Sequence, residues 1–316
     1  MDTVDSLTAD LRIVSLIPSA TEIVAALGYE NCLVGRSHEC DFPARVKELP
    51  VCTAPKFDPN GSSAQIHERV SELLSSALSV YRVEVDVLKA LRPTHIITQA
   101  QCDVCAASLG DVEQAANDLM ADEIEIEIVS LQPNRLADVW GDIVRVAKAI
   151  GDSAAESVAM RLVDELKQTL GDLAEGSASE EKTVACIEWT EPLMAAGNWV
   201  PELVSLAGGR SCFGKAGEHS DWMQWAELVA ADPDMIVVMP CGYDLAQARR
   251  AAEEMSDRDE WRSLSAVKAR NVYLVDGNQY FNRPGPRLVE SGQILAEIIQ
   301  GRTVDSSRGS AGWETF

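Results

Sequence analysis

A long helix-favouring stretch constrains the fold more than any other feature of this sequence. From Leu136 to about Leu173, apolar residues recur at helical spacing, and only Gly151-Asp152 interrupts the pattern. On both sides of it, short apolar runs alternate with helical segments, which is typical of α/β folds with parallel sheets. We therefore expect two parallel-sheet α/β lobes joined by a long helical backbone, with a ligand cleft between the lobes. A single helical connection limits hinge bending and indicates a rigid two-lobed clamp.

The boundaries of these parts follow from changes in composition. We expect an N-terminal α/β lobe over 11–134, an inter-lobe helical backbone over 135–174, a C-terminal α/β lobe over 182–300, and a flexible tail over 302–316. Ser19 is placed to cap a helix, with Glu22 three residues later as its capping-box partner. Helical periodicity is also expected over Tyr81–Leu91 and near Trp222–Ala230.

Charge and hydropathy exclude several classes of partner. Fifty acidic residues against 27 basic ones give a net charge of -23, which argues against nucleic acid and against an anionic membrane surface. No run of 18 apolar residues exists, so the protein is not expected to be membrane-embedded. The acidic start lacks a secretory signal. As written the chain is expected in the cytoplasm, and in the periplasm if the sequence lacks its native start.

Two cysteine-containing loops follow expected strands. Ser37–Asp41 contains His38 and Cys40, and Gln101–Cys105 contains the Cys-x-x-Cys pair Cys102 and Cys105. Both loops would lie at the carboxyl ends of parallel strands, where α/β sheets bind ligands. These four residues could hold structural zinc or an iron–sulfur cluster. A redox dithiol, direct ligation of a metal carried by a bound ligand, and loop packing without chemistry are the alternatives.

Aromatic residues are few, at 5%, yet they gather where strands end. Such a wall suits a flat, large, mostly apolar ligand, although the same residues could simply form the core. The candidate ligand-binding residues from both lobes are Ser19, Tyr81, Trp189, Trp199, Tyr243, Tyr280 and Phe281. No nucleophile elbow, phosphate loop or Ser-His-Asp order is present, so an enzyme is not the leading interpretation.

Over residues 11 to 300 the chain resembles the substrate-binding proteins of cobalamin and iron-siderophore ABC importers. Four stretches carry the resemblance: RIVSLIPSATE (12–22), LRPTHII (91–97), WVPELVSLAGG (199–209) and DPDMIV (232–237). The third is similar to the cobalamin-binding branch in particular. The resemblance implies that a corrinoid such as cobalamin, or a similar tetrapyrrole or metal chelate, binds in the cleft.

The same resemblance implies an ABC permease as a partner. In exported relatives an acidic residue on each lobe docks to the transporter, and Glu202 and Asp86, or its neighbour Glu84, fall at these places. The chain departs from the family in its missing export signal and in its two cysteine loops. The alternative is therefore a cytoplasmic zinc or iron–sulfur protein, or a metal-dependent enzyme, on the same scaffold, using His38, Cys40, Cys102 and Cys105.

Overall fold

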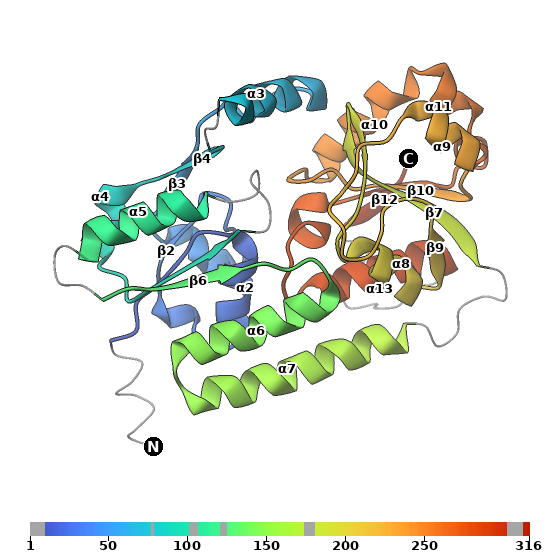
Figure 1. Ribbon diagram of the computed structural model, residues 1–316. Coiled ribbons are helices and arrows are strands. Elements are labelled where there is room, and N and C mark those ends of the chain that lie inside the picture. Colours follow the sequence, from blue (N-terminus) through green and yellow to red (C-terminus); the bar gives the residue numbers. More distant parts are fainter. Residues whose placement is uncertain (1–9, 77–78, 101–106, 121–124, 174–180, 302–311) are drawn as a thin grey trace. The chain divides into compact units, whose positions relative to one another are not determined.

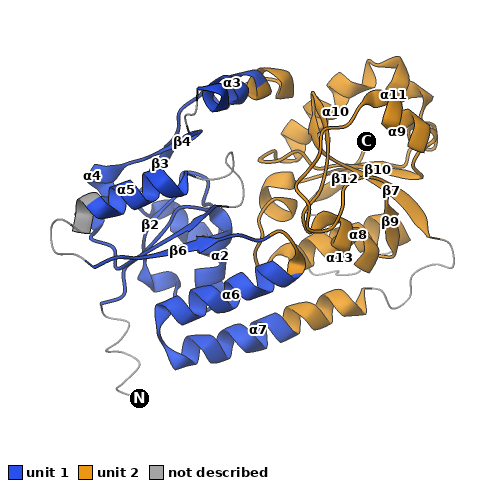
Figure 2. Cartoon of the chain, in the orientation of Figure 1, with its two compact units in different colours: residues 1–60, 68–133, 137–164 blue, residues 61–67, 134–136, 165–316 orange. Residues whose placement is uncertain are grey.

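A computed structural model describes residues 10–76, 79–100, 107–120, 125–173, 181–301 and 312–316 (Figure 1). These residues divide into two compact units (Figure 2). Unit 1 takes the described residues of Met1–Asn60, Glu68–Pro133 and Ala137–Asp164, and unit 2 takes those of Gly61–His67, Asn134–Leu136 and Glu165–Phe316. Both units are α/β, so the expected fold class is confirmed.

Unit 1 is built on a parallel sheet of four strands in the order β2-β1-β5-β6. The strands are β1 (Ile13–Ser15), β2 (Leu33–Arg36), β5 (His95–Gln99) and β6 (Glu127–Leu131). Parallel neighbours need crossover connections, which here contain helices α2 (Pro18–Ala26), α4 (Val85–Leu91) and α5 (Leu109–Met120). All four strands therefore end at one edge of the sheet, and the loop with His38 and Cys40 follows β2 directly.

Two local expectations in unit 1 are wrong. Tyr81–Val83 forms strand β4, which pairs antiparallel with β3 (Thr53–Pro55), and the helix begins only at Val85. These residues form a strand rather than a helix because they can pair with β3, which is distant in the sequence. Ser19 does not cap α2, because the helix already begins at Pro18, a residue favoured in the first turn. Helix α3 (Ser63–Ser75) is divided between the units, and its part from Glu68 onward belongs to unit 1. Unit 1 also contains the 3-10 turns η1 (Glu30–Cys32) and η2 (Ala44–Glu48).

The long helix-favouring stretch forms α6 (Leu136–Ile150) and α7 (Ser153–Asp172), as expected. The break between them is well defined: Gly151 has a φ of 76°, and Asp152 Oδ1 accepts a hydrogen bond from the backbone N–H of Ala154 at 2.8 Å. Asp152 also accepts from the Tyr29 hydroxyl at 2.5 Å. A left-handed glycine followed by a capping aspartate ends one helix and starts the next.

Unit 2 contains a mixed sheet in the order β12-β11-β10-β7-β8, with β9 also paired to β7. Strands β7 (Lys182–Thr190), β9 (Gly209–Ser211), β10 (Met235–Val238) and β11 (Val272–Val275) are parallel, whereas β8 (Leu193–Ala195) and β12 (Trp313–Thr315) are antiparallel to their neighbours. The helices of unit 2 are α8 (Val200–Leu206), α9 (Trp225–Ala231), α10 (Leu245–Ser256), α11 (Asp259–Ser263), α12 (Ser265–Lys268) and α13 (Leu288–Gln300), with a π-helical turn η3 (Gly277–Phe281).

The end of the chain corrects the expected flexible tail. Trp313–Thr315 forms β12 against β11, and the Trp313 ring lies 5.9 Å from that of Tyr273. The indole N–H of Trp313 donates to Glu297 at 2.9 Å, and Phe316 packs on the core of unit 2. Residues 302–311 lie outside the described residues. A second correction concerns the helix expected near Trp222–Ala230. The capping box of Gln224 and Glu227 starts α9 only at Trp225, and Trp222 instead forms a β-bridge with Met194.

A buried carboxyl group in α6 gives unit 1 a pH-dependent stability. Asp142 pairs with Arg145 at 2.8 Å, and burial raises the pKa of Asp142 to about 6. The folded protein then holds the proton more tightly than the unfolded chain, so the free energy of unfolding falls as pH rises from about 4 toward about 6.

Asp142→Asn removes this titration while keeping the shape of the side chain. We compare the free energy of unfolding of the variant with that of wild type at each pH. This difference should be more favourable to the variant at pH 7.5 than at pH 5, by roughly 1 kcal/mol. Urea unfolding at the two pH values measures this, with the exposed Asp164→Asn on α7 as the matched control. Equal changes at both pH values for Asp142→Asn would contradict the assignment.

Candidate functional site

The loop after β2 is organised around the hydroxyl group of Thr53. The backbone N–H of His38 donates to Thr53 Oγ1 at 3.2 Å, and His38 Nδ1 lies 2.8 Å from the same oxygen. Thr53 Oγ1 in turn donates to Ser37 Oγ at 3.1 Å. Thr53 has a single hydroxyl proton, and the bond to Ser37 uses it. Thr53 Oγ1 can therefore only accept from His38, whose Nδ1 must carry the hydrogen. His38 Nε2 is then the nitrogen with the lone pair.

His38 stays neutral over the physiological pH range. Burial, with a smaller contribution from Arg36, lowers the pKa of His38 to about 4. The imidazole ring lies 5.0 Å from the Tyr81 ring at an angle of 53°, and the Tyr81 hydroxyl donates to Glu39 Oε1 at 3.1 Å. A neutral imidazole with its Nδ1–H occupied can offer Nε2 to a metal ion.

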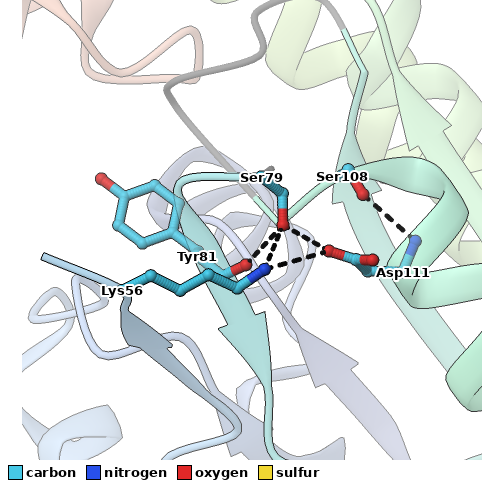
Figure 3. A network of polar contacts seen from close by, with 5 residues as sticks. All are labelled: Lys56, Ser79, Tyr81, Ser108 and Asp111. Carbon is cyan, nitrogen blue, oxygen red and sulfur yellow. Dashed lines mark hydrogen bonds and ion pairs between the residues drawn. The ribbon is translucent and has the colours of Figure 1, made fainter. Parts of the chain in front are cut away.

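The start of β4, from which Tyr81 extends, is fixed by a polar network (Figure 3). Lys56 Nζ donates to Ser79 Oγ at 2.7 Å, and Ser79 Oγ donates to the Tyr81 carbonyl oxygen at 2.9 Å. Asp111 joins the network through Ser79 and lies 3.8 Å from Lys56 Nζ, and Ser108 caps its helix. Figure 3 shows the Tyr81 ring pointing away from these groups. The network therefore fixes the backbone of Tyr81, and the Tyr81 ring remains in contact with His38.

Cys40 lies in a cluster of hydroxyl groups rather than on the surface. Its side chain is buried, and Thr21 Oγ1 lies 3.0 Å from Cys40 Sγ and 2.8 Å from Ser15 Oγ, within hydrogen-bond distance of both. Cys102 and Cys105 lie outside the described residues. Among the residues that the structure does describe, no group of three or more His, Cys, Asp or Glu side chains could hold a metal ion. The four-residue metal site stays a prediction.

Further polar groups line the same edge of the sheet. Ser19 in the first turn of α2 and Thr98 near the end of β5 are fully buried, and neither hydroxyl has a hydrogen-bond partner in the described part of the chain. Buried polar atoms without partners are uncommon in folded proteins. The role of Ser19 in ligand binding stays a prediction.

In unit 2, two of the five predicted aromatic residues form a pair at the sheet edge. Trp189 lies next to the last residue of β7, and its ring is 5.4 Å from that of Tyr243, which follows β10. The Trp189 indole N–H donates to the Glu191 carbonyl oxygen at 3.1 Å. Trp189 is half-buried, so part of the ring is available to a ligand.

The other three aromatic residues lie in the interior of unit 2, and Tyr243 is also buried. The Trp199 indole N–H donates to the Phe281 carbonyl oxygen at 2.9 Å, and both side chains are buried. Tyr280 is also buried, with the Arg287 guanidinium 4.8 Å above its ring. These contacts give the three residues structural roles, and their contact with a ligand stays a prediction.

The two predicted docking acids differ in their surroundings. Asp86 is exposed in the first turn of α4. Glu202 on α8 accepts a hydrogen bond from the backbone N–H of Leu136 at 2.9 Å and so caps the start of α6. Glu84, the alternative to Asp86, pairs with Arg82 at 2.7 Å. A docking role for Asp86 and Glu202 stays a prediction.

Comparison with known proteins identifies relatives along nearly the whole chain. A "Periplasmic binding protein" family model matches residues 13–278. An uncharacterized ABC transporter substrate-binding lipoprotein of Bacillus subtilis is 27% identical over 297 residues, covering 91% of this chain and 79% of its own length. A vitamin B12-binding protein of Vibrio cholerae is 23% identical over 293 residues, covering 92% of this chain and 89% of its own length.

Solved structures share the fold. The periplasmic vitamin B12-binding protein of Vibrio cholerae superposes with a TM-score of 0.61 at 20% identity, covering 91% of this chain and 96% of that one. A periplasmic heme-binding protein from Pseudomonas aeruginosa gives a TM-score of 0.67 at 18% identity, covering 92% and 93%.

These findings bear on two expectations, that the protein is not membrane-embedded and that it lies in the cytoplasm. Within the described residues, no helix is long and apolar enough to cross a membrane. The relatives are named as a lipoprotein and as periplasmic proteins, so the expectation of a cytoplasmic protein is not supported. Because the family model matches most of its length, the chain belongs to the periplasmic binding protein family, as its sequence motifs predict.

Proposed function

We propose that this protein is the substrate-binding component of an ABC importer and binds a corrinoid, such as cobalamin, or a related metal tetrapyrrole. The observation that carries the proposal is the pairing of His38 with Tyr81, which puts a metal-ligating nitrogen beside an aromatic face. Relatives and structural neighbours named for vitamin B12 and heme binding support the same class of ligand.

The chemistry of such ligands matches these side chains. A corrin or porphyrin ring has two broad apolar faces and a metal ion at its centre. Stacking of an aromatic side chain on such a face contributes about 0.5–1.5 kcal/mol beyond the burial of area. Each unit by itself offers groups of this kind. In unit 1, His38 Nε2 lies beside Tyr81 and could ligate the metal, and in unit 2, Trp189 and Tyr243 form an aromatic pair that could contact such a ring.

The proposal includes an exported location and a permease partner. An importer's binding protein works outside the cytoplasmic membrane, as the names of the relatives indicate for those proteins. Asp86 is the better docking candidate on the surface, because it is exposed and has no capping role, whereas Glu202 caps α6.

Calorimetric titration with cyanocobalamin, cobinamide and hemin tests the ligand class. We expect one of the three to bind, and Trp189→Ala to weaken binding about tenfold, since it removes both area and stacking. Trp189→Phe keeps a flat ring and is the matched control, with a loss of less than about threefold. Absence of heat and of any visible-band shift with all three compounds would contradict the proposal.

A second candidate is a resident metal site, favoured by the presence of His38 and Cys40 on one loop. The site would also need Cys102 and Cys105, and thiolate and imidazole ligands suit zinc. Under the importer proposal, untagged protein carries less than about a tenth of an equivalent of zinc or iron. Elemental analysis of wild type and Cys102→Ser decides: one equivalent that disappears in Cys102→Ser would establish the metal site instead.

A further inference from the structure

Helix α3 is unusual in this protein because only its first residue is buried. It spans Ser63–Ser75, and all its residues after Ser63 are partly or fully exposed. In the described chain, no other helix or strand packs along it over an extended contact. Helices in proteins are stabilised mainly by burying an apolar face, so α3 depends on few contacts: those of its first turns and that of Val70, which packs on the core of unit 1.

The contacts of the first turns are made within unit 2, to which Gly61–His67 belongs. Thr190 Oγ1 donates to Ser63 Oγ at 2.7 Å, and the Tyr243 hydroxyl lies 3.4 Å from the same atom. Ser63 is 1% exposed. One turn later, the His67 ring meets the ring of Trp222 edge-on at 5.1 Å. We call residues 61–67 the α3 anchor.

The α3 anchor lies on the edge of the sheet that binds ligands in α/β proteins. Thr190 is the last residue of β7, and Tyr243 follows the carboxyl end of β10, which is parallel to β7. Ligands of open α/β sheets bind outside the carboxyl ends of such strands. Ser63 thus lies within reach of the hydroxyl of Tyr243, and the Tyr243 ring is in contact with that of Trp189, its partner in the aromatic pair assigned above to the ligand.

The chain turns at the start of the anchor, two residues before the buried Ser63. Gly61, the first residue of the anchor, has a φ of 136°, which only glycine adopts readily. On the other side, Arg69 donates to the carbonyl oxygen of Asp58 at 2.9 Å and also to that of Asn60. These bonds span Gly61 and tie α3 to the turn before it, so the helix and the turn form one piece.

We propose that the α3 anchor is a displaceable cover on the aromatic surface of unit 2, and that the ligand takes the place of Ser63 beside Trp189, Thr190 and Tyr243. The second half of this inference rests on the proposed function. Ligand and anchor then compete for one surface, so the apparent dissociation constant equals the intrinsic one divided by the uncovered fraction. Loosening the anchor therefore tightens binding.

Ser63→Ala is the variant that tests this. It leaves the buried Thr190 hydroxyl without its acceptor, which favours release of the anchor. Hydroxyl-radical footprinting should show Trp189 and Tyr243 modified roughly threefold faster than in wild type. Titration with cobinamide and hemin should give an affinity about three- to tenfold higher for whichever macrocycle binds wild type. Ser75→Ala, at the exposed end of the same helix, should change neither measurement.

The two measurements separate the two parts of the inference. An unchanged footprint in Ser63→Ala would overturn the cover itself. A faster footprint with weaker binding would make Ser63 part of the binding surface and overturn the competition. If wild type and both variants bind neither macrocycle, the proposed function and the displacement by ligand both fail, while the footprint still decides whether the anchor opens.

Discussion

Gly197→Ala is expected to lower the free energy of unfolding of unit 2 by roughly 3 kcal/mol. A Cβ at this position would lie 2.6 Å from the Glu218 carbonyl oxygen and 2.8 Å from the backbone of His219 and of Ser220. Backbone atoms cannot rotate away as a side chain can, so the whole segment has to shift.

That shift breaks the bonds that hold the segment before Trp199. Asn198, with a φ of 51°, donates its backbone N–H to Glu218 and accepts at its carbonyl oxygen from Gly217 at 2.9 Å. The backbone N–H of Gly197 also donates to Ser220 Oγ at 3.0 Å. Each buried bond that is lost leaves polar groups unpaired, at about 1–3 kcal/mol per group.

Gly171→Ala is the matched control, because a Cβ there meets nothing within 4 Å and the residue lies inside α7. Alanine in a helix interior is favoured over glycine by about 0.5–1 kcal/mol, so this variant should be slightly more stable. Urea unfolding followed by circular dichroism measures both. A Gly197→Ala protein as stable as wild type would contradict the backbone contact described above.

Trp261→Ala is expected to cost about 3–5 kcal/mol. Trp261 on α11 is 1% exposed, and its ring meets those of Trp225 and Phe316 edge-on at 6.5 and 6.3 Å. It is among the largest fully buried side chains of the described chain, and alanine would leave a cavity that these neighbours cannot fill.

Trp222→Ala removes the same side chain from a position that is 54% exposed, and should cost less than about 1 kcal/mol. Thermal and urea unfolding of the two variants give the comparison. Similar losses for both would show that the core of unit 2 is not centred on Trp261.

Much of the fold could be predicted from local pattern. The buried runs of β1, β5, β10 and β11 and the long α6–α7 stretch are recognisable because each is specified by its own residues. Strands β4 and β12 could not be predicted, because each exists through pairing with a strand that is distant in the sequence. The role of Trp313 becomes clear only in the folded structure, where its strand pairs with β11.

The candidate site divides in the same way. The sequence correctly places His38 and Cys40 after β2, and the structure brings Tyr81, a predicted ligand residue, to the His38 ring. Thr53, which selects the tautomer of His38, was missed because it is 15 residues away and carries no motif. Trp199 and Phe281 have the same local signal as Trp189, since an aromatic residue at a strand end can face either the core or a ligand.

The most direct test of the account is a competition measured by native mass spectrometry. The full chain is mixed with equal amounts of cyanocobalamin, cobinamide, hemin and a ferric siderophore, and the mass of the complex identifies what has bound. We predict a one-to-one complex with a corrinoid or with hemin. A protein that binds only the siderophore, or none of the four, would contradict it.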